Sequence, residues 1–297
     1  MSVWDWLRQQ AKAVLPEGWI SDAPVIPVVR LIGPIGMVTP FSASMSLSTV
    51  AAPLERAFRI KRAPVVAIVV NSPGGSAVQS RLIHERIRYL ADEHEKPVLV
   101  FLEDAAASGG YMIACAGDEI FADPSSIVGS IGVLAAGFGF VELIQKLGIE
   151  RRVYTAGEKK VTLDPFQPEV AEDIEHLKAL QLDVHETFID LVRERRGSRL
   201  KPGEDLFTGR FWTGKTGVEL GLVDQIGELR SVIKARFGDK AKVKLISPPK
   251  SLLPGRGAPV GVSHGASASG ASLAGASFAA GLMAEIEARA LWSRLGL

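Results

Sequence analysis

Apolar and polar positions alternate along the chain with two different periods. Five short apolar runs have the length of buried strands, at residues 25–32, 64–70, 97–102, 119–122 and 243–246. Helix-like spacing fills the intervals Ala77–Asp92 and Ser108–Ala116. Strands that alternate with helices in this way predict βαβ units around a mostly parallel sheet, and so an α/β fold.

The middle of the chain carries a longer amphipathic pattern, which predicts a helix over roughly residues 167–196. Its Glu and Arg residues mark a solvated face, and five apolar residues predict a buried one: Leu177, Leu180, Val184, Phe188 and Leu191. Before this helix we expect a short helix in VELIQKLG and a strand over Arg151–Thr155.

Composition changes sharply after Pro249. Residues 255–281 are mostly Gly, Ala and Ser, which cannot bury enough apolar surface to fold alone. The sequence therefore predicts four segments: an N-terminal helical segment at 1–24, a folded domain at 25–249, a linker at 250–281 and a C-terminal helix at 282–297.

Charge and composition narrow the class of partner and the compartment. The net charge is +1, with 34 basic and 33 acidic residues among 297, so we expect no nucleic-acid partner. The single cysteine, Cys115, excludes an intrachain disulfide, and we interpret it as packing in a reducing compartment. Charged residues interrupt the N-terminal pattern MSVWDWLRQQAKAV, so we expect no signal peptide and no membrane span. We expect a cytoplasmic protein. Two tryptophans near the N-terminus are also compatible with peripheral contact at the inner membrane surface.

Two consecutive strand-to-helix turns carry small residues. NSPGGS at 71–76 follows the second predicted strand, and Ser108-Gly109 follows the third. Such turns lie at the same edge of a parallel sheet, where α/β folds place their sites. The N–H groups of Gly75 and Gly109 can form an oxyanion hole beside the Ser108 hydroxyl. An ordinary N-cap serine is the simpler alternative.

A serine nucleophile needs a base, and the residues alone do not choose one. None of the five histidines lies between Gly109 and Asp173, and no G-x-S-x-G elbow is present, so a histidine triad has little support. A lysine can serve when burial keeps it neutral. The candidates between Ser108 and the long helix are Lys146, Lys159 and Lys160.

GRFWTGKT at 209–216 fits the P-loop expression, but the residues before it are polar and broken by Pro and Gly. A P-loop follows a buried strand, so we do not expect nucleotide binding. Phe211 and Trp212 are predicted core anchors, and Lys215 is predicted to be exposed.

Five motifs in order resemble the signal peptide peptidase A family, Ser–Lys peptidases with the Clp protease/crotonase-like fold. They are NSPGGS, ASGGYMIA at 107–114, GSIGV at 129–133, AGEKKVTLDPF at 156–166 and GRFWTGKTGVELGLVD at 209–224. The resemblance covers about residues 25–247 and implies that the folded domain at 25–249 is a Ser–Lys peptidase domain. It implies the following roles: Ser108 as nucleophile, Lys160 as general base, Ser130 as the serine that holds the lysine, and Gly74, Gly75 and Gly109 as the oxyanion hole.

The resemblance further implies a serine endopeptidase that cleaves signal-peptide remnants or other short apolar or unfolded peptides, without metal or cofactor. It implies a homo-oligomer with active sites near subunit interfaces, and leaves open whether Ser108 and Lys160 meet within one chain or across chains. The apolar run 127–141 is the expected substrate groove. Two alternatives remain. A crotonase-like acyl-CoA enzyme would use the same oxyanion hole without Ser108, and a non-catalytic scaffold would use neither.

Overall fold

The computed structural model describes residues 23–36, 44–157, 159–247 and four residues near the C-terminus, 290, 292, 293 and 295. The predicted N-terminal segment, linker and C-terminal helix therefore lie almost entirely outside the described residues, and the predicted domain boundaries stay predictions.

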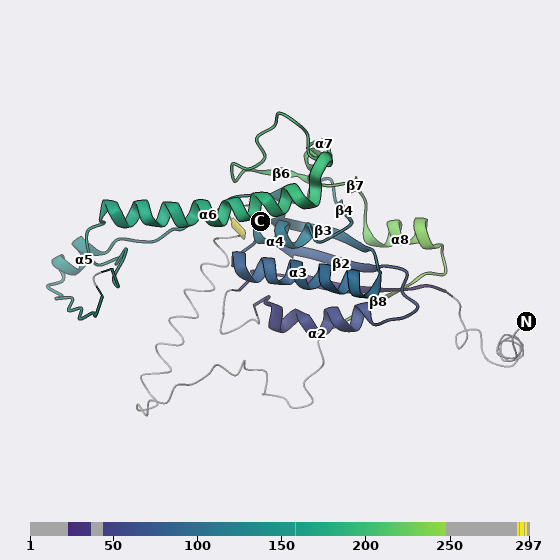
Figure 1. Cartoon of the computed structure of the whole chain (residues 1–297), viewed down its shortest axis with the longest axis horizontal. Coiled ribbons are helices and arrows are strands. Elements are labelled where there is room, and N and C mark those ends of the chain that lie inside the picture. The colour runs from purple at the N-terminus through teal and green to yellow at the C-terminus, as the bar shows by residue number, and fades with distance from the viewer. Residues whose placement is uncertain are drawn as a thin grey trace, which may run out of the picture.

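An eight-stranded sheet forms the body (Figure 1). Its strands are β1 Val25–Ile32, β2 Val66–Ser72, β3 Val98–Ala107, β4 Glu119–Ala122, β5 Ile127–Gly129, β6 Phe211–Thr213, β7 Gln225–Ile226 and β8 Lys242–Leu245. The order is β6-β5-β3-β2-β1-β8, with β4 beside β3 and β7 beside β4. Every pairing is parallel except that of β5 with β6. The predicted α/β fold with repeated βαβ units is confirmed.

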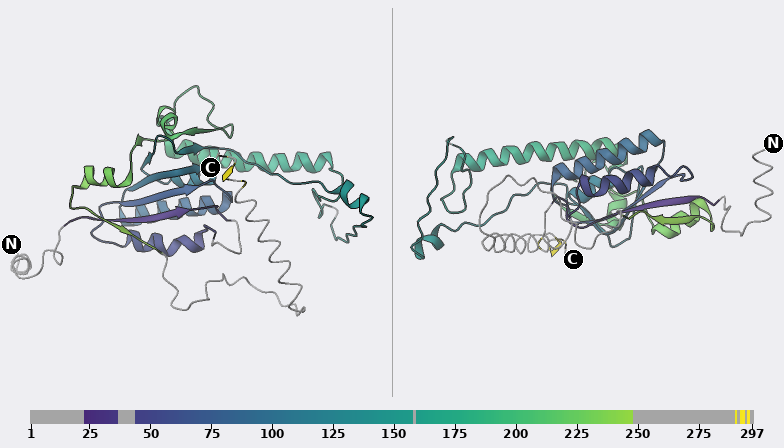
Figure 2. Two further views of the ribbon diagram at one scale, coloured as in Figure 1. Left: turned by 180° about the vertical axis from the view of Figure 1, so that it is seen from behind. Right: turned by 90° about the horizontal axis from the view of Figure 1, so that it is seen from below.

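Helices cover both faces of this sheet (Figure 2). They are α2 Leu47–Phe58, α3 Ala77–His94, α4 Gly109–Ala114, α5 Val141–Lys146, α6 Ala171–Arg196, α7 Gly214–Glu219 and α8 Leu229–Phe237, with a short 3₁₀ turn at Gly197–Arg199. The larger core lies between the sheet and α2, α3, α4 and α6, and a smaller one lies under α8. The continuous apolar run of β2 follows from burial on both faces.

Strand β3 continues five residues past its predicted end at Leu102, through Ala105–Ala107. The alanines pair in parallel with β5, and all three are fully buried. The strand therefore runs directly into Ser108, and α4 begins at the next residue.

Residues 133–157 and 159–187, which we call the arm, project from the body and include α5 and about the first two thirds of α6 (Figures 1 and 2). Only the last turns of α6 are buried against the body, through Phe188 and Leu191. Leu180 and Val184 are 49% and 39% exposed, so their predicted burial is wrong, because this part of α6 extends past the edge of the body.

The predicted strand at Arg151–Thr155 is also wrong. This segment lies in the arm and has no regular secondary structure, because no described strand of the sheet reaches it as a hydrogen-bonding partner. Among the described residues, no helix combines the length and apolar character needed to cross a bilayer.

Candidate active site

Ser108 occupies the tight turn between β3 and α4. Its backbone has φ 52° and ψ −121°, a left-handed conformation that costs a non-glycine residue free energy. Its N–H donates to the Gly129 carbonyl at 2.8 Å, and its own carbonyl accepts from the N–H groups of Tyr111 and Met112. The hydroxyl makes no hydrogen bond with a described residue. Backbone contacts therefore fix this half-buried side chain and leave its oxygen available.

Gly74 lies directly against Ser108. A Cβ atom at Gly74 would be 2.8 Å from Ser108 Cβ and 3.1 Å from the Gly109 nitrogen, and its φ is +107°. Only glycine permits this close approach of the two turns. The Gly74 N–H is already used, because it donates to the Ser72 hydroxyl at 3.2 Å.

The N–H groups of Gly75 and Gly109 remain available. Gly109 is the first residue of α4, so its N–H has no partner within the helix. Gly75 is placed by backbone bonds on either side of it: Ile35 N–H donates to the Gly74 carbonyl, and Ser76 N–H donates to the Ile35 carbonyl. Neither glycine N–H has an acceptor in the part of the chain described, so Gly75 and Gly109, rather than Gly74, offer the two donors.

Ser80 supports this arrangement, although nothing in the sequence pattern singled it out. A Cβ atom at Gly109 would lie 2.2 Å from the Ser80 hydroxyl oxygen. That hydroxyl donates to the Ser76 carbonyl at 2.8 Å. The start of α4 is thus packed closely on the first turn of α3.

Ser130 lies beside Ser108, since Gly129 accepts the Ser108 N–H. Ser130 also has a left-handed φ of 53°, and its N–H donates to the Arg210 carbonyl at 2.7 Å. The Trp212 ring lies under Gly129, where a Cβ atom would approach the ring to 2.7 Å. The GRFW sequence therefore supports the Ser130 turn, a role that its sequence pattern did not indicate.

The same segment excludes the P-loop interpretation. The strand β6, Phe211–Thr213, occupies positions that would form the phosphate loop, and it is the antiparallel edge of the sheet. Trp212 packs on the main core, but Phe211 is 44% exposed, so its predicted role as a core anchor is wrong: a strand at the sheet edge has only one covered side. Lys215 is exposed, as predicted.

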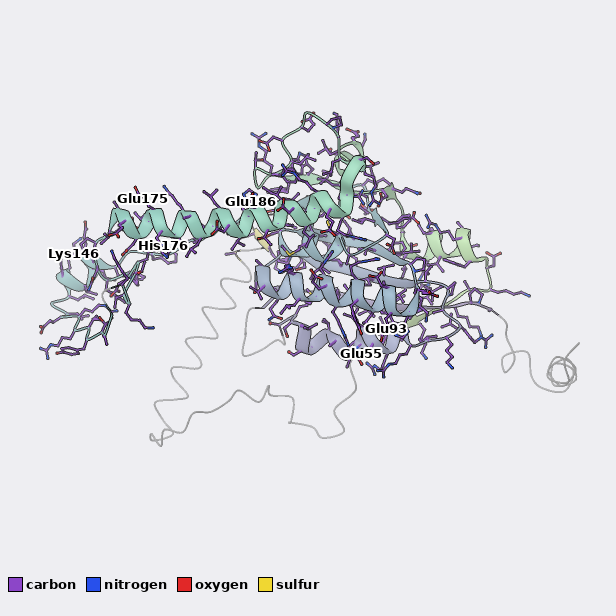
Figure 3. The ribbon with its side chains drawn as sticks, viewed as in Figure 1. Glu55, Glu93, Lys146, Glu175, His176 and Glu186 are labelled. Carbon is purple, nitrogen blue, oxygen red and sulfur yellow. The ribbon has the colours of Figure 1, made fainter. Side chains whose placement is uncertain are left out.

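Lys160 lies in the arm, far from Ser108 in the same chain. Its neighbour Lys159 pairs with Glu172 in the first turn of α6, with 2.7 Å between Nζ and Oε2. Glu172 lies 13 residues before His185 on α6, which is about 20 Å along the helix. His185 is the residue of α6 that reaches the serine turn, with 3.1 Å between its Nε2 and the carbonyl oxygen of Ile131, next to Ser130. Figure 3 labels Glu175 and His176 near the start of α6, the end at which Lys159 pairs with Glu172, and Lys146 on α5.

The structure thus brings together Ser108, Ser130 and the three glycines, but it does not bring Lys160 to them within one chain. The hydroxyls of Ser108 and Ser130 and the Lys160 ammonium make no hydrogen bond or ion pair with any described residue. Lys160 is exposed. Its predicted role stays a prediction.

The end of the arm is nevertheless an ordered unit. Arg151 Nε donates to Asp164 Oδ2 at 2.8 Å, and the Asp164 side chain is only 2% exposed. The Arg151 guanidinium lies 5.0 Å from the centre of the Phe166 ring, which packs against Phe140. These contacts fix the PF end of the AGEKKVTLDPF motif, and the loop with Lys160 projects from it.

Beneath α4, buried polar groups are paired. Arg196 is 2% exposed and makes two hydrogen bonds to Asp224, at 2.9 and 3.0 Å. The Tyr111 hydroxyl donates to the Leu222 carbonyl at 2.8 Å. Burial raises the pKa of the Cys115 thiol to about 12, which keeps it protonated and fits its predicted packing role. No group of three or more potential ligands in the described ranges forms a metal site.

The fold and the site define the class of protein: an α/β protein that places a free serine hydroxyl beside two unused backbone N–H groups at the edge of a parallel sheet. Residues 91–244 match the model of Peptidase family S49, and the chain belongs to this family.

Three relatives illustrate the similarity. A Brucella abortus protein named Na(+)/H(+) antiporter NhaA is 57% identical over 287 residues, which are 96% of this chain and 39% of that protein. The chloroplastic serine protease SPPA of Arabidopsis thaliana is 35% identical over 205 residues, 65% of this chain and 30% of that protein. The putative protease MJ0651 of Methanocaldococcus jannaschii is 34% identical over 169 residues, 57% of this chain and 54% of that protein. The chain thus spans well under two thirds of each relative.

Proposed function

We propose that this chain is the subunit of a homo-oligomeric serine endopeptidase in which Ser108 is the nucleophile and Lys160 of a neighbouring copy is the general base. The observation that carries the proposal is the Ser108 turn, with a free hydroxyl beside the Gly75 and Gly109 N–H groups. Membership of Peptidase family S49 supports the reaction class. The lysine and the substrate are our proposals.

The proposed reaction follows from these positions. Neutral Lys160 Nζ takes the proton of Ser108 Oγ, which forms a bond to the scissile carbonyl carbon. The Gly75 and Gly109 N–H groups donate to the resulting oxyanion. The C–N bond then breaks, and the amine leaves with the proton from Lys160. Water next attacks the Ser108 ester while Lys160 takes its proton, and that proton returns to Ser108 Oγ as the acid product leaves. Ser130, adjacent to Ser108, orients the incoming lysine.

Surface composition supports assembly of several copies. The arm exposes many large apolar side chains: Leu134, Phe138, Leu143, Leu147, Ile149, Tyr154, Val170, Leu180 and Leu182. A soluble monomer rarely exposes so much apolar surface together. Contact of this surface with a second copy would bury it and bring Lys160 into a desolvated position, which favours the neutral amine.

We propose short apolar or unfolded peptides, including signal-peptide remnants, as substrates. The support is family membership together with the position of Ser108 at a turn of small residues. An extended chain can approach such a turn closely, whereas a folded protein cannot.

The test is hydrolysis of a fluorogenic apolar peptide by the full chain, with Ser108→Ala, Lys160→Ala and Lys159→Ala compared. We expect Ser108→Ala and Lys160→Ala each to lower kcat/KM at least about 10³-fold. Lys159→Ala is the matched control, because it removes a neighbouring ammonium that makes an exposed ion pair with Glu172 and a looser one with Asp173.

Three results would contradict the proposal. Activity lost in Lys159→Ala but kept in Lys160→Ala would reassign the base. Thioester hydrolysis that survives Ser108→Ala would favour the acyl-CoA alternative. A correctly assembled wild type that cleaves no peptide at any pH would favour the scaffold.

A further inference from the structure

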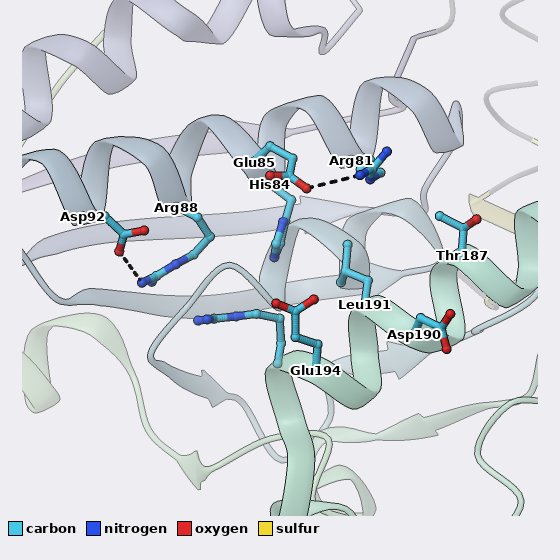
Figure 4. A pocket seen from close by; sticks show the side chains of 10 residues that line it. Arg81, His84, Glu85, Arg88, Asp92, Thr187, Asp190, Leu191 and Glu194 are labelled. Carbon is cyan, nitrogen blue, oxygen red and sulfur yellow. Dashed lines mark hydrogen bonds and ion pairs between the residues drawn. The ribbon is translucent and has the colours of Figure 1, made fainter.

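A cavity of about 580 Å³ separates α3 from α6 at the point where the arm leaves the body (Figure 4). It lies near Cys115, at the opposite end of α4 from Ser108. Charged side chains from both helices line it, and the proposed peptidase reaction uses none of them.

His84 is the innermost polar group of this cavity. It is 5% exposed, and neither of its ring nitrogens has a hydrogen-bond partner. The nearby Cys115 carbonyl acts to raise the pKa of the ring, but neither ring nitrogen meets hydrogen-bond geometry with it. Burial, followed by the charges of Arg195 and Arg88, lowers the pKa of His84 to about 4. The ring is therefore neutral near pH 7 and offers one N–H donor and one acceptor without partners.

Positive charge surrounds the imidazole, although part of it is neutralised. Arg88 and Arg195 share Asp118, at 2.9 and 3.6 Å. Arg81 makes only a loose pair with Glu85, at 3.6 Å between two side chains that are each 58% exposed. The Arg81 guanidinium is therefore free to turn toward a bound anion.

Negative charge without a partner lies on the opposite wall. Asp190 and Glu194 are spaced four residues apart on α6 and so share one face of the helix. Neither carboxylate makes an ion pair or hydrogen bond with a described residue. In Figure 4 the Glu194 carboxylate and the His84 ring point toward one another from the two helices.

We infer that this cavity binds a small zwitterion, namely a free amino acid or a short peptide with free termini. Its carboxylate accepts from Arg81 and from the His84 N–H, which a rotation of the ring must first expose because neither ring nitrogen is accessible to solvent. Its ammonium lies between Asp190 and Glu194. A simple anion would leave both acidic groups unpaired, and a simple cation would meet the guanidinium groups. The inference goes beyond the proposed peptidase function and does not depend on it, since it rests only on the charges and on the unpaired imidazole.

Calorimetric titration of the full chain carrying Ser108→Ala tests this inference, because that background cannot cleave a bound peptide at Ser108. The probes are alanyl-alanine, its N-acetyl derivative and its C-terminal amide. We expect alanyl-alanine to bind at least tenfold more tightly than either blocked form. Equal binding of a blocked form would show a simple anion or cation site, and no binding of any probe would also overturn the inference.

Substitutions of residues that line the cavity test whether alanyl-alanine binds there. The double variant Asp190→Asn/Glu194→Gln and the single variant His84→Gln should each weaken alanyl-alanine binding at least tenfold. Glu175→Gln, an exposed position on α6 about 22 Å before Asp190, should leave it unchanged. Binding that persists in both cavity variants would place the dipeptide elsewhere and refute the site. The amide-like side chains keep the volume of the originals, and circular dichroism verifies the fold of each variant.

Discussion

At the residue scale, backbone strain is concentrated around the serines. Four described non-glycine residues have positive φ, and two of them are Ser108 and Ser130. Each is fixed by a short backbone hydrogen bond, from Ser108 N–H to Gly129 and from Ser130 N–H to Arg210. A left-handed serine persists only where its surroundings impose it, and such positions are common at functional sites. The small residues around Ser108 predicted access to its hydroxyl. They did not predict the strain, which depends on β5 and β6.

Gly74→Ala tests how closely the two turns must approach. The new methyl group would lie 2.8 Å from Ser108 Cβ and 3.0 Å from the Ala107 carbonyl oxygen, so the nucleophile must shift. Displacement by about 1 Å can cost about 10²-fold in rate, and we expect that loss in kcat/KM for peptide hydrolysis. Gly238→Ala is the control, because it also has positive φ but no atom within 4 Å of the added methyl. Both should lose roughly 1–2 kcal/mol of stability from strain, and equal activities would contradict the close approach.

At the element scale, α6 shows what the sequence could and could not predict. Its periodicity located the helix, and Phe188 and Leu191 are buried as expected. The same pattern continues through Leu180 and Val184, which are exposed in this chain. Periodicity reports which face of a helix is apolar, but not which molecule covers that face. The predicted strand at Arg151–Thr155 fails for a related reason, since strand formation needs a neighbouring edge that the arm lacks.

The contact between α3 and α6 should weaken in mild acid. The pKa of His84 is lowered from 6.5 to about 4, chiefly by burial, so the unfolded chain binds more protons than the folded chain between these values. Stability from the neutral imidazole is therefore complete above pH 6.5 and is lost as the pH falls toward 4, by roughly 3 kcal/mol. Urea unfolding of wild type and His84→Gln at pH 7 and pH 4.5 measures this. The free energy of unfolding of His84→Gln should change less between these pH values than that of wild type. An equal change in both proteins would show that His84 is already protonated or accessible.

At the scale of the whole molecule, the chain separates its nucleophile from its expected base. The motifs predicted the cluster at the sheet edge because consecutive βα turns must end there, and Ser108, Gly75 and Gly109 do meet. No such topological rule applies to Lys160, which lies within the projecting arm. The distance of Lys160 from Ser108 depends on the length and direction of α6 relative to the body, and no sequence pattern specifies that direction. The arm tip is ordered by Arg151 and Asp164, so it does not fold back as a loose loop.

Mixing two inactive variants tests whether neighbouring copies complete each other's sites. Ser108→Ala retains a working lysine, and Lys160→Ala retains a working serine. If the dyad forms between copies, random co-assembly from equal amounts restores about a quarter of the sites, because each site needs one intact residue from each of two adjacent subunits. Co-expression followed by peptide hydrolysis measures the recovery, and co-assembly of Ser108→Ala with the double variant Ser108→Ala/Lys160→Ala is the inactive control. Mixed oligomers that form but stay inactive would require Lys160 to reach Ser108 within its own chain. In that case the arm would have to bend back across the body, and the exposed apolar face of α6 would be the surface on which it folds.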